Sequence, residues 1–531
     1  MKKMIVITAS LLSATLLPSM AFAAQTKSED DASSLNSGLL EQIAALRAEV
    51  QELRAEINLK KSPQPTTEYS TTLPPPSRVV SADAVRVDNP LRSGPAAQAD
   101  GTPVVDTIRY KGITITPGGF LELSGIYRQH FQGNDISSSL AIPFPNSHGG
   151  YVSEGRFSAR QSRFSFLVQG KVNPTLNMGL FAETDFQGGA QTANSVQSNS
   201  FNPRVRQLYG SMDWTYKDHG FHFLAGQSWS LVTMGARGIA ARSEAIPPTI
   251  DGQFNAGFAW SRQPGIRFAA DFLDHQVWVA IAAENAQSSF GGIVPANITN
   301  VVPAGQGFDA ANLLSLNHLP DVIGKVAVDT RVAGRALHIE TFGIVRSFQV
   351  HRANSGNPTA TGFGWGGGLN FQAFPGVLDI QLSGMTGKGI GRYGTSLLPD
   401  VTLSADGDIH PIQEYMVLVG TVAHLTRSLD LYTFAGLEQQ RRQVLGNGFG
   451  IGLPTTDNSG CLIEGGTCTG NTRRIREVSV GFWQRLYQGP FGRALIGAEY
   501  NYTQRQLFEG VVGRLQASQN MAFLSFRYFP F

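Results

Sequence analysis

The fold prediction starts from Leu515 to Phe531, which reads LQASQNMAFLSFRYFPF. This stretch has the pattern of one long strand, rich in Phe and Tyr, and its final residue is aromatic. At the edge of a soluble sheet, so apolar a strand would leave a row of N–H and C=O groups unpaired. In a closed barrel within a bilayer, the last strand pairs with the first, and every backbone polar group is satisfied. We therefore predict that this segment closes a transmembrane β-barrel.

The composition of the 531 residues agrees with a barrel. Charged residues make up 15%, hydrophobic residues 42%, and there are 59 glycines. Beyond the N-terminal segment no run of about 18 apolar residues occurs, which excludes a transmembrane helix there. Barrel strands alternate lipid-facing and lumen-facing residues, so their mean hydropathy is moderate. The net charge of +2, with scattered basic residues, gives no case for a nucleic-acid partner.

The N-terminal segment, residues 1–23, is predicted to be a secretory signal peptide. Lys2 and Lys3 precede an apolar run, and Ala21-Phe22-Ala23 forms a small-x-small cleavage site. The apolar run is short for a membrane anchor, which is the alternative interpretation. The mature chain would then begin at Ala24.

Residues 24–61 are predicted to form a short periplasmic coiled coil. The apolar positions that define the heptad seam are Leu39, Ile43, Leu46, Val50, Leu53 and Ile57. β-Branched residues at a with Leu at d favour a dimer, whereas a transmembrane barrel of the kind predicted above favours a trimer, and this conflict stays open. An amphipathic helix lying on its own barrel is the alternative. Residues 62–106, rich in Pro, Ser and Thr, are predicted to be a linker.

Residues 107–531 are predicted to form an all-β, 16-stranded antiparallel transmembrane barrel. The predicted strands are 118–131, 156–171, 175–187, 203–217, 220–231, 263–273, 275–287, 320–331, 336–351, 359–374, 377–388, 410–426, 429–443, 473–487, 491–508 and 514–531. Short and long connections alternate, and an even count places both barrel ends beside the short periplasmic turns. Fourteen and eighteen strands are the alternatives. The order of side chains between Arg527 and Phe531 breaks the alternation, so a bulge near the end is a second open point.

In such a barrel, charges at the narrowest point of the lumen would determine which solutes pass. The segment Val232 to Ser261 is the predicted inward loop, because it is long, rich in small residues and carries two arginines. The predicted pore-lining, anion-binding residues are Arg128, Arg163, Arg237, Arg242, Arg267 and Arg346. A planar guanidinium can bind both oxygens of a carboxylate or phosphate. The alternative is structural pairing of these arginines with Glu122, Glu183, Glu340 and Glu499.

Cys461 and Cys468 are the two cysteines of the chain. In a secreted protein this spacing predicts a local disulfide that holds a loop, and with no nearby His it is a poor metal site. No G-x-S-x-G, H-E-x-x-H or P-loop pattern occurs. We therefore expect neither an enzyme nor a cofactor.

Three stretches near the start of the barrel resemble a known family. They read GGFLELSGIYRQHF (118–131), ARQSRFSFLVQGKV (159–172) and GLFAETDFQGG (179–189). Together with the order of signal peptide, coiled coil, linker and barrel, they are similar to the DcaP-like outer-membrane porins and, more loosely, to the phosphate-selective porins. The resemblance implies a homotrimer with a basic lumen that favours dicarboxylates. It identifies no individual ligand residue.

The sequence thus predicts an outer-membrane porin for passive diffusion of small anionic solutes, dicarboxylate-like in chemistry. Its expected partners are two further copies of the chain, outer-membrane lipid and lipopolysaccharide. A general or sugar-passing porin is one alternative. The other is a structural barrel that tethers the outer membrane to a periplasmic or cell-wall partner through the coiled coil.

Overall fold

The computed structural model describes Gln51 and residues 107–135, 142–188, 202–303 and 313–531. The chain divides into two compact units, Met1–Val79 and Val80–Phe531. Apart from Gln51, the signal peptide, coiled coil and linker predicted for residues 1–106 lie outside the described residues. Within the described part of the chain, no helix is long and apolar enough to cross a membrane.

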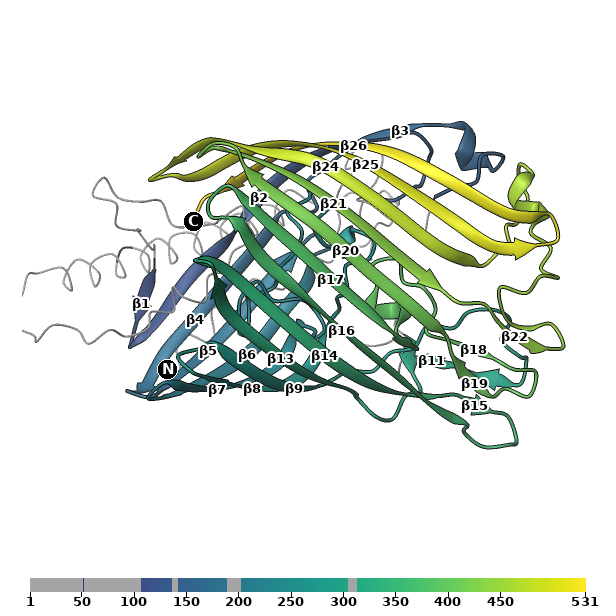
Figure 1. The fold of residues 1–531 in the computed structure, drawn as a ribbon, viewed down its shortest axis with the longest axis horizontal. Helices are drawn as coiled ribbons and strands as arrows, with labels where there is room; N and C mark the ends of the chain where they lie inside the picture. Colours follow the sequence, from purple (N-terminus) through teal and green to yellow (C-terminus); the bar gives the residue numbers. More distant parts are fainter. Residues whose placement is uncertain (1–50, 52–106, 136–141, 189–201, 304–312) are drawn as a thin grey trace, which may run out of the picture. The chain divides into compact units, whose positions relative to one another are not determined.

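The second unit is a closed antiparallel barrel of 16 strands, as predicted (Figure 1). Each strand pairs with its neighbour in chain order, and the last pairs with the first. The barrel strands are β2 (Ile113–Arg128), β4 (Arg163–Asn173), β5 (Leu176–Asp185), β6 (Arg204–Tyr216), β7 (His219–Trp229), β8 (Arg262–Phe272), β9 (Val277–Glu284), β13 (Asp321–Val332), β14 (Arg335–Gln349), β16 (Thr359–Phe374), β17 (Leu378–Lys388), β20 (Gln413–His424), β21 (Leu429–Gln440), β24 (Thr472–Gly489), β25 (Gly492–Gly510) and β26 (Gly513–Phe529).

Ten shorter strands extend the barrel or lie in its connections. β1 (Ile108–Tyr110) and β3 (Glu154–Ser158) both pair with β2, and β3 continues the line of β4. The others are β10 (Ile298–Thr299), β11 (Val301–Pro303), β12 (Leu313–Ser315), β15 (His351–Arg352), β18 (Val401–Leu403), β19 (Ile409–Pro411), β22 (Gln443–Gly446) and β23 (Phe449–Ile451). Those labelled in Figure 1 lie at the end of the barrel opposite the C-terminus, where the long connections gather.

The closing strand keeps one register over its C-terminal part. β26 pairs with β2 from Leu121↔Tyr528 to Arg128↔Met521, and its pairing with β25 is unshifted from Gln506↔Gln516 to Arg493↔Phe529. The bulge considered for Arg527 to Phe531 is therefore wrong. Phe529 instead shares the lumen side with Arg527, and its ring centroid lies 5.2 Å from that of Phe120.

The strands alternate between an exposed, apolar outer face and a buried inner face that mixes apolar side chains with most of the charged ones. On β26, Leu524 is 65% exposed while its neighbour Phe523 is 1% exposed. On β2, Leu121 and Leu123 face outward and Glu122 is fully buried inside. This period of two is the pattern of a barrel that is apolar outside and charged within.

Candidate functional site

The loop of residues 230–261, between β7 and β8, folds into the barrel and is held there by carboxylates of the wall. Its backbone N–H groups donate to inward-facing Asp and Glu side chains on strands around the lumen. The pairs are Leu231 to Glu284 (2.7 Å), Gly235 to Glu340 (2.9 Å), Gly238 to Asp329 (2.9 Å), Ile250 to Glu499 (2.5 Å), Ala256 to Glu477 (3.1 Å) and Gly257 to Glu438 (2.7 Å). Much of the negative charge of the wall is thus engaged by this inward loop.

Two glycines allow the inward loop to approach the wall closely. A Cβ at Gly436 on β21 would lie 1.6 Å from the carbonyl oxygen of Ala256. A Cβ at Gly257, whose φ is +85°, would lie 2.0 Å from the carbonyl oxygen of Val417 on β20. Any larger residue at either position would have to push the loop into the lumen.

Four arginines gather on the wall formed by β4, β5, β6 and β8, and we call Arg163, Arg204, Arg206 and Arg262 the arginine cluster. Arg163, Asp185 and Arg204 are cross-strand neighbours in one row. Arg206 pairs with Glu183 at 2.6 Å and with Asp185 at 2.9 Å, and Arg204 pairs with Asp185 at 2.7 Å.

A β-bulge places Arg206 in this cluster. The register of β5 and β6 shifts between Glu183 and Thr184, so that Arg206 has no partner residue on β5. As a result Arg206 and Gln207, which are consecutive, are both buried on the inner face. Re-aiming a side chain in this way is a common use of bulges near functional sites.

Arg163 and Arg262 have no ion-pair partner within 4 Å among the described residues. The Cζ of Arg262 lies 5.0 Å from the ring centroid of Trp229 and 5.4 Å from that of Trp260. The Cζ of Arg163 lies 5.2 Å from the ring centroid of Phe120. Two side-chain nitrogens of Arg262, Nε and Nη1, and Nε of Arg163 lack a hydrogen-bond partner in the described structure. These three nitrogens are buried, whereas the two side chains as a whole are only half-buried.

The six arginines predicted to line the pore occupy different environments. Arg128 is fully buried and bound to Glu154 (2.9 Å) and to two backbone carbonyls of the following loop. Arg267 donates to the Trp229 carbonyl at 2.5 Å. Arg237 is exposed on the inward loop, and Arg242, half-buried, lies with its Cζ 5.5 Å from the Phe181 ring. The structure therefore brings Arg163 into the arginine cluster and places Arg128 elsewhere, near an outer connection.

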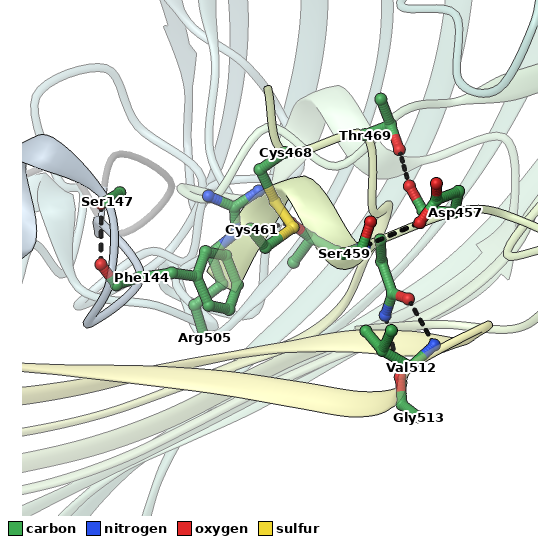
Figure 2. Close-up of a disulfide and its surroundings, with 12 residues drawn as sticks. Phe144, Ser147, Asp457, Ser459, Cys461, Cys468, Thr469, Arg505, Val512 and Gly513 are labelled. Carbon is green, nitrogen blue, oxygen red and sulfur yellow. Dashed lines mark hydrogen bonds between the residues drawn. A yellow bond between two sulfur atoms is a disulfide. The ribbon is translucent and has the colours of Figure 1, made fainter. Parts of the chain in front are cut away.

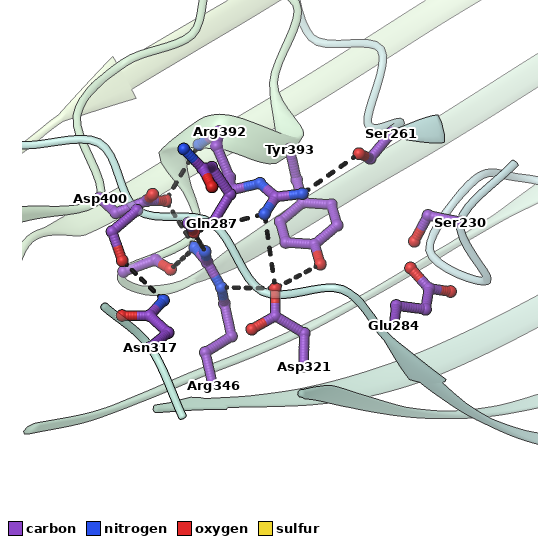
Figure 3. Close-up of polar contacts among 12 residues, drawn as sticks. Ser230, Ser261, Glu284, Gln287, Asn317, Asp321, Arg346, Arg392, Tyr393 and Asp400 are labelled. Atoms are coloured by element: carbon purple, nitrogen blue, oxygen red, sulfur yellow. Dashed lines mark hydrogen bonds and ion pairs between the residues drawn. The ribbon is translucent and has the colours of Figure 1, made fainter. Parts of the chain in front are cut away.

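Arg346 is enclosed in a network of its own (Figure 3). Its guanidinium contacts Asp321 at 3.0 Å and Asp400 at 2.6 Å, and both carboxylates are buried. Asp321 also accepts a hydrogen bond from the Tyr393 hydroxyl at 2.7 Å. The backbone carbonyl of Tyr393 in turn accepts from the backbone N–H of Trp260 at 2.7 Å. Arg346 therefore connects β13 and the connection that carries Asp400 to the inward loop, which is a structural pairing.

The four glutamates considered as partners divide between two roles. Glu122 pairs with Arg527 at 2.9 Å and Glu183 pairs with Arg206. Glu340 pairs with Lys325 at 2.7 Å and Glu499 accepts from Tyr432 and the inward loop. Only the first two are arginine partners.

Glu244, on the inward loop, is a carboxylate that lies near Arg242 and Arg267. Burial raises the pKa of its carboxyl above the ordinary value, while the charges of Arg267 and Arg242 act in the opposite direction. A larger fraction of Glu244 is therefore neutral at a given pH than for an exposed glutamate.

Cys461 and Cys468 form a disulfide in the connection between β23 and β24, with an S–S distance of 1.96 Å (Figure 2). Cys461 is fully buried and packs in an apolar cluster with Ile142, Phe144 and Leu507. The disulfide thus closes a loop within one outer connection, and the packing of Cys461 holds that connection against Ile142 and Phe144 of another. Among the described residues, no group of three or more His, Cys, Asp or Glu side chains could hold a metal ion.

Sequence reasoning missed three members of the arginine cluster, Arg204, Arg206 and Arg262. Arg204 and Arg206 lie two apart at the start of a predicted strand, which is a signal for one charged face. Nothing local indicated that Arg262 would stack against Trp229 and Trp260, because that contact depends on the path of the inward loop.

A closed 16-stranded barrel narrowed by an inward loop is the architecture of a channel protein. No family model and no curated protein matches the sequence. Among solved structures, the outer membrane channel DcaP of Acinetobacter baumannii aligns with a TM-score of 0.58 and 17% identity, covering 80% of this chain and 99% of that chain. OmpF of Salmonella typhi, in complex with daunomycin, aligns with a TM-score of 0.44, 10% identity and coverage of 80% and 100%. OprB of Pseudomonas putida aligns with a TM-score of 0.42, 9% identity and coverage of 78% and 94%. At 17% identity the likeness to DcaP establishes a shared fold, and the lower scores of the other two add nothing to it.

Proposed function

We propose that the protein is an outer-membrane porin that passes small anions, dicarboxylates above all, by passive diffusion. The barrel has the fold of the DcaP channel, an apolar outer face and a charged lumen. A polar interior inside an apolar band is what a water-filled channel in a bilayer requires.

The observation that carries the anion preference is the division of charge inside the barrel. Backbone amides of the inward loop engage six wall carboxylates, whereas the arginine cluster has four guanidiniums against Glu183 and Asp185. An excess of positive charge in a narrow, water-filled passage favours anions by electrostatic focusing.

A dicarboxylate suits the cluster because two of its guanidiniums lack an acidic partner among the described residues. Arg163 and Arg262 are both half-buried, so one solute with two carboxylates could contact the accessible part of each guanidinium. Weak contact with several arginines in turn allows a solute to enter and also to leave.

The alternatives of a general or sugar-passing porin have less support. Exposed aromatic faces would favour a sugar, but the faces of Trp229 and Trp260 are contacted by Arg262.

A homotrimeric assembly, the signal peptide and a periplasmic coiled coil remain part of the proposal, as does lipopolysaccharide as a partner. Deleting residues 24–62 separates a tether from a channel: a tether loses envelope attachment with conductance unchanged.

The test is the reversal potential of the purified protein in a planar bilayer under a salt gradient. The native channel should be anion-selective, and Arg163→Gln and Arg262→Gln should each lower the selectivity. Charge reversal at Arg237 and Arg242 should move it further, since both lie on the inward loop. The matched control is Arg335→Gln, a guanidinium on the outer face of β14. A cation-selective or unselective native channel would contradict the proposal.

A further inference from the structure

The outer face of the barrel has a groove of about 880 Å³ across β21, β24, β25, β26, β2 and β3. Its floor is made of small residues, including Gly125, Gly155 and Ala522. Its sides are large apolar side chains that point away from the lumen, such as Phe157 (74% exposed) and Leu524 (65% exposed). A groove of this composition is suited to an extended hydrocarbon chain.

A basic patch lies at the outer end of the same strands. A bulge between Thr472 and Arg474 turns both Arg473 and Arg474 toward Gln506, whose Oε1 accepts from them at 3.0 Å and 3.1 Å. Two guanidiniums are thus held side by side on one neutral oxygen. Arg476 follows on the outer face of β24, and the charges of Arg473, Arg476 and Arg514 all act on Arg474.

A second copy of the barrel wall offers this patch no opposite charge. Apart from Glu509 at the outer end of β25, every Asp and Glu on the described barrel strands lies on the inner face. Glu509 itself is already paired with Arg514 at 3.5 Å. The anion that complements Arg473, Arg474 and Arg476 must therefore come from something other than the outer wall of another subunit.

The spacing between patch and groove matches one leaflet of a membrane. Arg476 and Val480, which lines the groove, are four residues apart on β24, or about 13 Å along the strand. The hydrocarbon of one leaflet is about 15 Å thick, half of the bilayer core. A lipid whose headgroup contacts Arg476 therefore has acyl chains long enough to reach the groove.

We propose that this face is a specific binding site for a phosphorylated lipid of the outer leaflet. The phosphate binds Arg473, Arg474 and Arg476, and one acyl chain lies in the groove below. The proposal rests on the membrane location proposed above, but it is independent of the ion selectivity of the lumen.

The test measures lipid retained by the detergent-purified full-length protein in native mass spectrometry. Three probes are compared: diphosphoryl lipid A, the same lipid with both phosphates removed, and inorganic phosphate alone. The native protein should retain the first and neither of the others. The double variant Arg473→Gln/Arg474→Gln should retain it at least about a hundredfold less, because two charge-assisted hydrogen bonds are lost.

Two further variants separate the parts of the site. Ala522→Leu fills the groove without altering charge and should also weaken retention, whereas Arg335→Gln, a cation elsewhere on the outer face, should not change it. Equal retention of the dephosphorylated lipid, or of diphosphoryl lipid by the double variant, would overturn the proposal. So would efficient disulfide cross-linking of Ala522→Cys between subunits, since that places a second copy in the groove. Loss of anion selectivity with lipid retention intact would count against the channel proposal alone.

Discussion

Arg527 on β26 donates a hydrogen bond of 3.0 Å from Nη2 to the carbonyl oxygen of Ile250 in the inward loop. Through Nε the same guanidinium pairs at 2.9 Å with Glu122 on β2, across the seam where the barrel closes. Its Cζ lies 4.4 Å from the ring of Trp483, which in turn donates to the Pro248 carbonyl at 2.8 Å. One residue of the closing strand therefore joins the seam to the loop that narrows the lumen.

Replacing Arg527 with Ala should destabilise the barrel and loosen the inward loop together. Glu122 would be left fully buried without its cation, and breaking a buried pair in this way costs about 3–5 kcal/mol. Denaturant unfolding followed by tryptophan fluorescence measures the loss of stability, and single-channel recording measures new closing events. Arg335→Ala, on the outer face, is the control. An unfolding midpoint equal to that of the native protein would show that the seam does not depend on this pair.

Arg346 should matter for stability and not for selectivity. Arg346→Met would leave Asp321 and Asp400 buried without their shared cation, so we expect a loss of about 3–5 kcal/mol. The reversal potential should move less than in Arg262→Gln, because the guanidinium of Arg346 is neutralised by two carboxylates. Unfolding curves and bilayer recordings on both variants make the comparison. A large shift of selectivity in Arg346→Met, with native stability, would show that Arg346 lines the pore and that its pairing does not stabilise the barrel.

The barrel was predictable from the sequence because alternation with a period of two is a local property. Leu121 and Leu123 against Glu122 already show which face of β2 meets lipid. The even number of strands followed from the alternation of short and long connections. The register at Phe529 was not predictable, because its ring packs inward against Phe120, more than 400 residues earlier in the chain.

The candidate site was predictable only in part. The inward loop could be located by its length and small residues, and Arg163 by its inward parity. The bulge that turns Arg206 inward has no marker in the sequence. Arg346 pairs with Asp321 on the preceding strand, β13, and with Asp400 in a distant connection, and only the folded chain shows that these two carboxylates share one guanidinium.

Reduction of the Cys461–Cys468 disulfide should loosen the outer connection without altering conduction. Closing a short loop of this size contributes about 2–3 kcal/mol by restricting the unfolded chain. Cys461 also packs on Phe144 and Leu507, so the connection of residues 142–151 should loosen as well. Limited proteolysis of the native protein, with and without reductant, should show faster cleavage between 453 and 471 when the bond is reduced. The Cys461→Ser/Cys468→Ser variant should be cleaved fast in both conditions, and equal rates throughout would show that packing alone holds the connection.

Acidification should increase anion selectivity, and Glu244 should account for part of the increase. Because burial raises the pKa of its carboxyl, Glu244 binds a proton at a higher pH than exposed glutamates do. As the pH falls, protonation removes the negative charge of Glu244, while Arg242 and Arg267 keep their positive charges. The local potential therefore becomes more positive. Glu244→Gln has lost that charge at every pH, so it should be more anion-selective than the native channel at neutral pH and equal to it at acidic pH. Reversal potentials recorded from neutral to acidic pH on both proteins test this, with the outward-facing Gln439→Glu as a control for an added carboxylate away from the lumen. Parallel pH profiles that never converge would show that Glu244 does not contribute to the pH dependence.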